Sequence, residues 1–150
     1  MRTHRLEREQ RLDHPIDQVF EFFSRASNLE QITPAWLSFA VLTPEPIEMH
    51  VGALIEYRLR VHRVPLRWVS RIEEWEPGRG FADRQLRGPY RLWHHRHTFE
   101  PADGGTIVRD QVDYALPFGR LGELAHPLFV SRDIESIFEY RHQAVDRLLG

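Results

Sequence analysis

The chain has 150 residues, the usual size of one domain, so we expect a single domain over residues 1–150 with a buried core. With 41% hydrophobic and 28% charged residues and a net charge of −2, it resembles ordinary globular proteins and favours neither nucleic acid nor an anionic membrane. The absence of cysteine excludes disulfides, thiolate catalysis and cysteine-ligated zinc.

The N-terminal part predicts a strand followed by two short helices. Residues alternate from Arg5 to Leu12, which indicates a half-exposed strand. A short helix then begins near Asp13, as N-cap, and Pro15, in its first turn. A second short helix is expected at Leu29 to Ile32 and a strand at Ser38 to Leu42. One face of the first strand holds Leu6, Arg8, Gln10 and Leu12, and the first helix has an apolar face of Ile16, Val19, Phe20 and Phe23.

The middle of the chain predicts strand after strand with short turns between them. Consecutive strands joined by tight turns must be antiparallel neighbours, so this block is a meander. Turn residues lie at 77–80, 88–89 and 103–105. The expected strands are Ala53–Val64, Leu66–Glu76, Phe81–Arg87, Tyr90–Glu100 and Thr106–Leu116.

A long helix is expected at the C-terminal end, from about Ser131 to Leu149. Residues 117–127 before it are predicted to be a loop, either a gate over a cavity or an ordinary connector. The fold class is therefore α+β: a curved antiparallel sheet of about seven strands, in the order β-α-α-β6-α, around the long helix. Such a sheet leaves a mostly apolar cavity, the usual kind of binding site. The apolar stripe of the helix is Ile134, Ile137, Phe138, Val145 and Leu148.

Several local motifs resemble a known family. They are Trp68–Ile72, Glu74–Pro77 with Phe81–Asp83, Gly88–Tyr90 leading to Trp93, His95, His97 and Phe99, then Gly105–Thr106 with Asp110, Val112 and Tyr114, and Leu116–Gly119. With the element order, they are similar to the START and Bet v1-like (SRPBCC) superfamily, and most of all to a bacterial ligand-binding subfamily related to polyketide cyclase/dehydrase and coenzyme Q-binding domains. The resemblance covers the whole chain and implies a helix-grip fold that holds a small hydrophobic ligand.

The densest group of chemically active residues is the run from Trp93 to His97. Alternation places His95 and His97 on the inward face with Phe99. If the turn at 103–105 sets Phe99 opposite Val108, then His97 lies opposite Asp110 and Trp93 opposite Tyr114. A His97–Asp110 pair either satisfies polar groups in the core and lines the cavity, or acts in general acid–base catalysis together with His95.

Metal binding is a further interpretation of His95 and His97, because an H-x-H pair on a strand puts two imidazoles on one face. Asp110 or Asp83 would have to complete the site. Two histidines do not define a metal site, so we predict no metal and no cofactor. The arginines from Arg58 to Arg71 form a basic stretch that is flanked by Glu56, Glu73 and Glu74, which predicts a mixed charged outer face rather than a nucleic-acid surface.

We therefore expect a cytoplasmic domain, without stable membrane insertion, that binds a lipid, isoprenoid or polyketide-like molecule. An enzyme of the cyclase, dehydratase or aromatase kind, and a protein-interaction domain with a vestigial cavity, are the alternatives. A protein partner or a homodimer also stays open. The expected ligand-binding residues are Tyr57, Leu59, Trp68, Ser70, Ile72, Phe81, Asp83, Gln85, Trp93, His95, His97, Phe99, Asp110, Val112, Tyr114, Ile134 and Phe138; His97, His95 and Asp110 would be catalytic in an enzyme.

Overall fold

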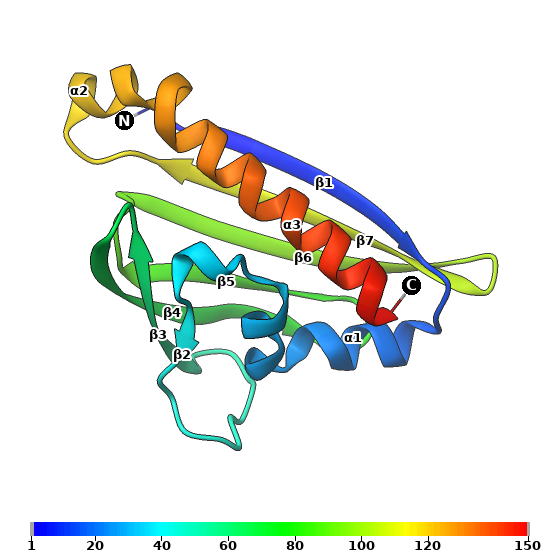
Figure 1. Cartoon of the computed structure of the whole chain (residues 1–150). Helices are drawn as coiled ribbons and strands as arrows, with labels where there is room; N and C mark the ends of the chain where they lie inside the picture. The colour runs from blue at the N-terminus through cyan, green and yellow to red at the C-terminus, as the bar shows by residue number, and fades with distance from the viewer. Residues whose placement is uncertain (1, 150) are drawn as a thin grey trace.

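The computed structural model describes residues 2–149 and confirms the predicted α+β order of elements (Figure 1). The strands are β1 (His4–Leu12), β2 (Ala40–Val41), β3 (Leu54–Val61), β4 (Val64–Glu76), β5 (Gly80–Arg87), β6 (Leu92–Ala102) and β7 (Gly105–Ala115). The helices are α1 (Ile16–Ser24), α2 (Gly119–Ala125) and α3 (Ser131–Leu149), with 3₁₀ segments η1 (Ala26–Ile32) and η2 (Ala35–Leu37) and a π-helical segment η3 (His126–Val130).

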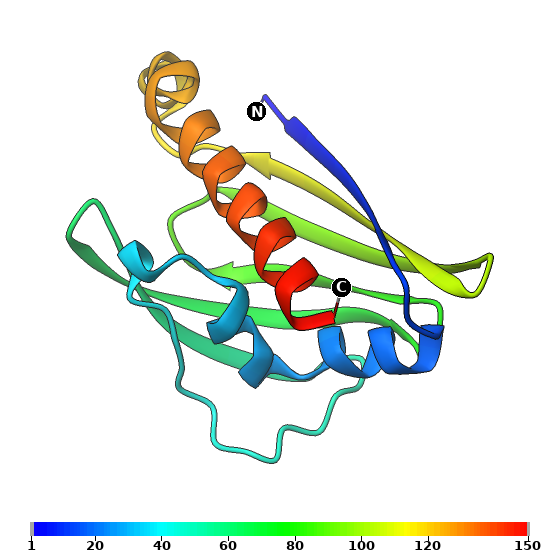
Figure 2. The same ribbon diagram turned by 45° about the vertical axis from the view of Figure 1, so that its right-hand side comes forward.

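The strands form one antiparallel sheet in the order β1-β7-β6-β5-β4-β3-β2. The long helix α3 runs diagonally across one face of this sheet, and α1 closes one end of it (Figures 1 and 2). Strand β4 has two irregularities in its pairing with β5, after Val69 and after Ile72. Such β-bulges increase the local bend and twist of a strand, which helps the sheet to curve around the helix.

The β6–β7 hairpin has the predicted register. Its turn is formed by Asp103 and Gly104, both with positive φ (44° and 80°), the backbone that a two-residue turn between twisted strands requires. The pairing sets Phe99 opposite Val108 and His97 opposite Asp110, as expected. Trp93 likewise lies opposite Tyr114, which confirms the predicted inward face of β6.

The closed end of the fold is an aromatic core beneath α1. Phe20 is 8% exposed, and its ring lies 5.3 Å from that of Trp75, 6.0 Å from Phe81 and 5.2 Å from Phe99. Val145 of α3 is fully buried in the same cluster. The last turns of α3 are therefore packed in this core, while Ile134 near its start is buried in a second cluster with Val112 and Tyr114.

Four local expectations were wrong in detail. Pro15, not Asp13, is the N-cap of α1, because its carbonyl accepts the hydrogen bonds of Gln18 and Val19. The second helix is a longer 3₁₀ segment, η1. The strand predicted at 38–42 is reduced to β2, since Ser38 (φ 47°) still belongs to the left-handed turn that ends η2. Leu148 is 46% exposed and does not join the stripe of α3.

The predicted loop after β7 is mostly helical, which corrects the expectation for residues 117–127. Glycines such as Gly119 and Gly122 are typical of a loop, but a Cβ at Gly122 would clash with the Pro117 carbonyl oxygen, so a glycine is needed there for α2 to pack closely. The segment is tied to the sheet by a hydrogen bond between the Tyr114 hydroxyl and His126 Nε2 (2.7 Å). His4 Nε2 also lies 2.9 Å from a carboxylate oxygen of Glu123.

The outer face of the sheet carries ion pairs, which confirms the expected mixed charge. Arg67 pairs with Glu56 (2.7 Å), and Glu73 lies between Arg71 and Arg84. Arg96 of β6 pairs with Glu74 of β4 (2.7 Å). Each of these arginines therefore has an acidic partner on the same face, as expected of a solvated protein surface.

We expect Phe20→Ala to lower the free energy of unfolding by roughly 3–5 kcal/mol, because it leaves a void among three aromatic rings. Urea unfolding at neutral pH measures this loss. Phe118→Ala is the matched control: Phe118 is 82% exposed, so its loss should change stability by no more than about 0.5 kcal/mol. Equal effects of the two changes would contradict the assignment of Phe20 to the core.

Candidate functional site

A cavity of about 440 Å³ lies between the sheet, α3 and the segments η1, η2, α2 and η3. Its walls are mainly apolar and aromatic; one group of polar side chains comes from β5, β6 and α3, and the ion pair of His62 with Asp133 lies elsewhere on the wall. Most of the residues expected from the sequence line it: Tyr57, Leu59, Trp68, Ser70, Ile72, Phe81, Asp83, Trp93, His95, His97, Ile134 and Phe138.

Five expected residues do not line this cavity. Gln85 is held by the backbone of Tyr90, because its side-chain amide both donates to and accepts from that residue. Phe99 and Val112 are buried in the two cores at either end of the cavity. Asp110 lies behind His95, and Tyr114 turns its hydroxyl to His126. Their positions correct the expected lining.

The most informative residue that the sequence analysis missed is Arg141 of α3, which also lines the cavity. A signal for it was present: Arg141 lies seven residues after Ile134 and three after Phe138, so it is the charged member of the apolar stripe. Its guanidinium carbon lies 5.5 Å from the ring centre of Phe23 and 5.7 Å from that of Phe138. Two aromatic faces thus hold the cation in place.

Two histidine–aspartate pairs cross the strands diagonally. His95 Nε2 lies 2.8 Å from Asp110 Oδ1, and His97 Nε2 lies 3.3 Å from Asp83 Oδ2. His97 Nδ1 is 3.1 Å from the same Asp110 oxygen but is not aligned for a hydrogen bond. The register places His97 opposite Asp110 as expected, and the two side chains lie in ion-pair contact, while the aligned hydrogen bond of Asp110 is made with His95.

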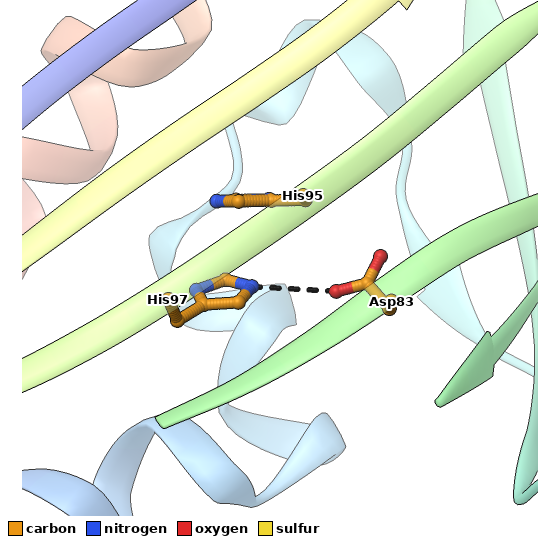
Figure 3. A group of neighbouring side chains, drawn as sticks. All are labelled: Asp83, His95 and His97. Atoms are coloured by element: carbon orange, nitrogen blue, oxygen red, sulfur yellow. Dashed lines mark hydrogen bonds and ion pairs between the residues drawn. The ribbon is translucent and has the colours of Figure 1, made fainter. Parts of the chain in front are cut away.

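Ring stacking explains the diagonal pattern. The ring of His97 lies between that of Phe81 (4.3 Å between centres) and that of His95 (3.7 Å). Figure 3 shows the two imidazoles stacked face to face, with Asp83 beside the outer nitrogen of His97. The stack fixes the planes of the rings, so that Nε2 of each ring faces its diagonal neighbour, while Nδ1 of His97 lies near Asp110 directly opposite.

The environment pushes the two histidine pKa values apart. Burial, together with the nearby His97, lowers the pKa of His95 to about 4, although Asp110 opposes this shift. Burial also acts to lower the pKa of His97, but the carboxylates of Asp110 and Asp83 outweigh it and raise that pKa. Of the two histidines, His97 therefore takes up a proton first, and His95 stays neutral.

The two carboxylates are kept ionised in spite of their burial. Burial alone would raise the pKa of Asp110, but Arg141 and the two histidines hold it well below its usual value. The pKa of Asp83 is likewise lowered, mainly by the hydrogen bond from His97. Arg141 supplies one positive charge to this buried cluster, and His97 supplies a second one when it is protonated.

Asp83, His95 and His97 bring three potential metal ligands within 4.8 Å of one another. A metal ion lies in the plane of each imidazole that binds it, about 2 Å from the nitrogen. Rings stacked 3.7 Å apart, with planes only 25° from parallel, do not point their nitrogens at one common position. The three side chains as arranged therefore do not fit a metal centre.

The family model described as "Polyketide cyclase / dehydrase and lipid transport" matches residues 12–137. The chain belongs to this family. It is thus a member of the Bet v1-like (SRPBCC) superfamily, as the sequence motifs implied. No curated protein sequence is detectably similar to it.

Solved structures from this superfamily share the fold over nearly the whole chain. The Zhui aromatase/cyclase from Streptomyces sp. R1128 is 17% identical, covers 98% of this chain and 96% of its own, and superposes with a TM-score of 0.67. Protein CV1439 from Chromobacterium violaceum is 15% identical, with 98% and 96% coverage and a TM-score of 0.72. These likenesses confirm the helix-grip fold.

The nucleoside-diphosphate sugar epimerase from Corynebacterium glutamicum carries a similar fold within a longer chain. It is 21% identical over 95% of this family member but only 28% of its own length, with a TM-score of 0.68.

Within residues 2–149, no helix is long and apolar enough to cross a membrane.

We expect His95→Gln to make stability less sensitive to acid. As the pH falls from 6.5 to about 4, the unfolded chain binds a proton at His95 that the native protein does not, so the native protein loses stability. Glutamine keeps a donor for Asp110 and does not titrate, so this loss, roughly 3 kcal/mol at most, should disappear. The raised pKa of His97 makes acid stabilise the native state, but this effect is present in the variant as well as in the unmodified protein. Urea unfolding between pH 7 and pH 4 measures the difference.

The matched control is His94→Gln, the neighbouring histidine whose side chain lies on the opposite face of β6. This variant should keep the pH dependence of the unmodified protein. If His95→Gln and the unmodified protein lose stability in parallel on acidification, His95 is not the buried neutral histidine described above.

Proposed function

We propose that this protein binds a small, mostly apolar molecule, of the lipid, isoprenoid or polyketide kind, in the cavity between its sheet and α3. The observation that carries the proposal is the cavity itself: about 440 Å³, with mainly apolar and aromatic walls. Cavities that hold small ligands usually measure about 300–1,000 Å³ and combine such walls with a few polar groups. The family description, which includes lipid transport, supports the same function.

The size of the cavity argues against the protein-interaction alternative, in which the cavity would be vestigial. A core without a ligand function is normally packed with few voids larger than a water molecule. Here the wall residues Leu59, Ile55 and Phe138 are well packed on their sheet or helix side and still line open space. Retaining such a void lowers stability, and a bound ligand would restore the lost contacts.

Proton transfer on the bound molecule is a second candidate function. The observation that favours it is the polar cluster on the cavity wall, where His97 lies between two carboxylates and next to Arg141. Paired groups with separated pKa values are typical of acid–base sites. The same cluster also serves a binding protein, because it anchors the polar end of a ligand, so binding remains the simpler proposal.

Filling the cavity should abolish ligand binding. Leu59 of β3 is 7% exposed and lines the cavity, so Leu59→Trp places an indole in the ligand space. With the neutral fluorescent dye Nile red as probe, we expect at least a tenfold loss of affinity, about 1.4 kcal/mol or more. Fluorescence titration measures it, and thermal unfolding confirms that the variant is folded.

The matched control is Leu54→Trp on the same strand. Leu54 is 54% exposed and alternates to the outer face, so an indole there should leave Nile red affinity unchanged. Equal loss in both variants, or no binding by the unmodified protein of Nile red or decanol, would contradict the proposed function.

The catalytic alternative has its own readout. A protein that transfers protons on a bound carbonyl compound should speed exchange of the α-protons of decan-2-one with deuterium from D2O, a C–H bond being broken and a C–D bond formed. NMR measures the rate, and His97→Gln should reduce it by roughly a hundredfold or more. Binding of the ketone without accelerated exchange would leave only the binding function.

A further inference from the structure

The guanidinium of Arg141 has two hydrogen-bond donors without an acceptor. Its Nε and Nη2 are buried, and neither has a hydrogen-bond partner among the residues that the structure describes. Leaving a buried donor unpaired destabilises the folded protein, and more so when the group is charged. Native proteins rarely keep such groups without a reason, and those that occur call for a specific explanation.

The nearby carboxylates of the protein do not accept hydrogen bonds from these donors. Asp110 accepts a hydrogen bond from His95, and Asp83 lies within hydrogen-bonding distance of His97. The positive charge of Arg141 helps to lower the pKa of both carboxyl groups. Their hydrogen-bond partners, however, are the histidines and not Arg141. The arginine thus balances charge in the cluster while its own N–H groups stay free for another acceptor.

The two free donors have a definite geometry. Nε and Nη2 form one edge of the planar guanidinium, from which two N–H bonds point in parallel, and this fork matches the two oxygens of a carboxylate. Arg141 lines the cavity, and Phe23 and Phe138 hold its guanidinium carbon at 5.5 Å and 5.7 Å from their ring centres. The guanidinium is therefore held in a fixed position on a cavity wall that also carries Asp83, His95 and His97.

We propose that the ligand of this cavity is an apolar molecule that ends in a carboxylate, whose two oxygens accept hydrogen bonds from Nε and Nη2 of Arg141. This inference rests on the proposed binding function and adds the chemical class of the ligand. A planar, singly charged group suits the site better than a phosphate, because the ionised Asp83 and Asp110 nearby disfavour a second negative charge. The apolar walls then take up the hydrocarbon part.

The test compares decanoate with decanol, which share a ten-carbon chain and differ in the head group. Isothermal titration calorimetry on the full chain should show decanoate binding at least about tenfold more tightly. In Arg141→Gln this preference should vanish, while affinity for decanol should stay within about threefold. Arg147→Gln is the matched control: it removes the same charge from α3, at an exposed residue outside the cavity, and should keep the preference.

The outcomes separate the two proposals. Equal affinity of the unmodified protein for decanoate and decanol would overturn the carboxylate proposal and leave the binding function standing. No binding of decanoate, decanol or Nile red would overturn the binding function itself. If Arg141→Gln does not fold, Arg141→Lys decides: it keeps the charge but lacks the parallel donors, so an undiminished preference for decanoate would contradict the bidentate contact.

Discussion

The register of the β6–β7 hairpin is the constraint on which the site depends. The turn at Asp103 and Gly104 has the positive φ angles that join two twisted strands directly, and it fixes every pair along the hairpin. A slip of one residue would turn His95 and His97 to the solvent and bring Arg96 inward. Because the register holds, one face of β6 supplies the cavity wall and the other supplies the surface ion pairs.

That register brings charged groups into a space that has to stay mostly apolar. Two buried carboxylates are tolerated because a protonated His97 and Arg141 offset their charge and because the histidines satisfy their oxygens. The stacked rings keep these groups in one fixed arrangement, which suits the recognition of a ligand's polar end and does not suit a metal ion. The polar cluster therefore lies on the wall of the cavity. In the proposed binding function, the cluster would orient a ligand that the apolar walls alone could bind in any direction.

Most of the fold could be predicted from local patterns. Strand alternation, turn residues and the stripe of α3 gave the order of elements, and the hairpin turn gave the register that puts His97 opposite Asp110. The helical character of residues 119–130 was missed because Gly122 signals a loop unless one knows that the backbone of Pro117 lies against it.

The details of the site needed three-dimensional information. Opposite positions in a ladder do not specify hydrogen bonds, since the stack of Phe81, His97 and His95 turns the ring nitrogens toward diagonal neighbours. The role of Arg141 was also hidden, because an arginine on a helix stripe usually extends its charged end to solvent. Only the position of α3 across the sheet shows that this one faces the cavity.

The central claim is that a ligand lies inside the cavity with its polar end toward α3. The most direct measurement is intermolecular NOEs between decanoate and the isotope-labelled protein. The account predicts contacts from the far methyl end of the chain to cavity-wall side chains such as Leu59 and Ile55, and from the carbon next to the carboxylate to Phe138 or Phe23 beside Arg141. Contacts confined to the exposed Leu121 and Leu124 of α2 would contradict it.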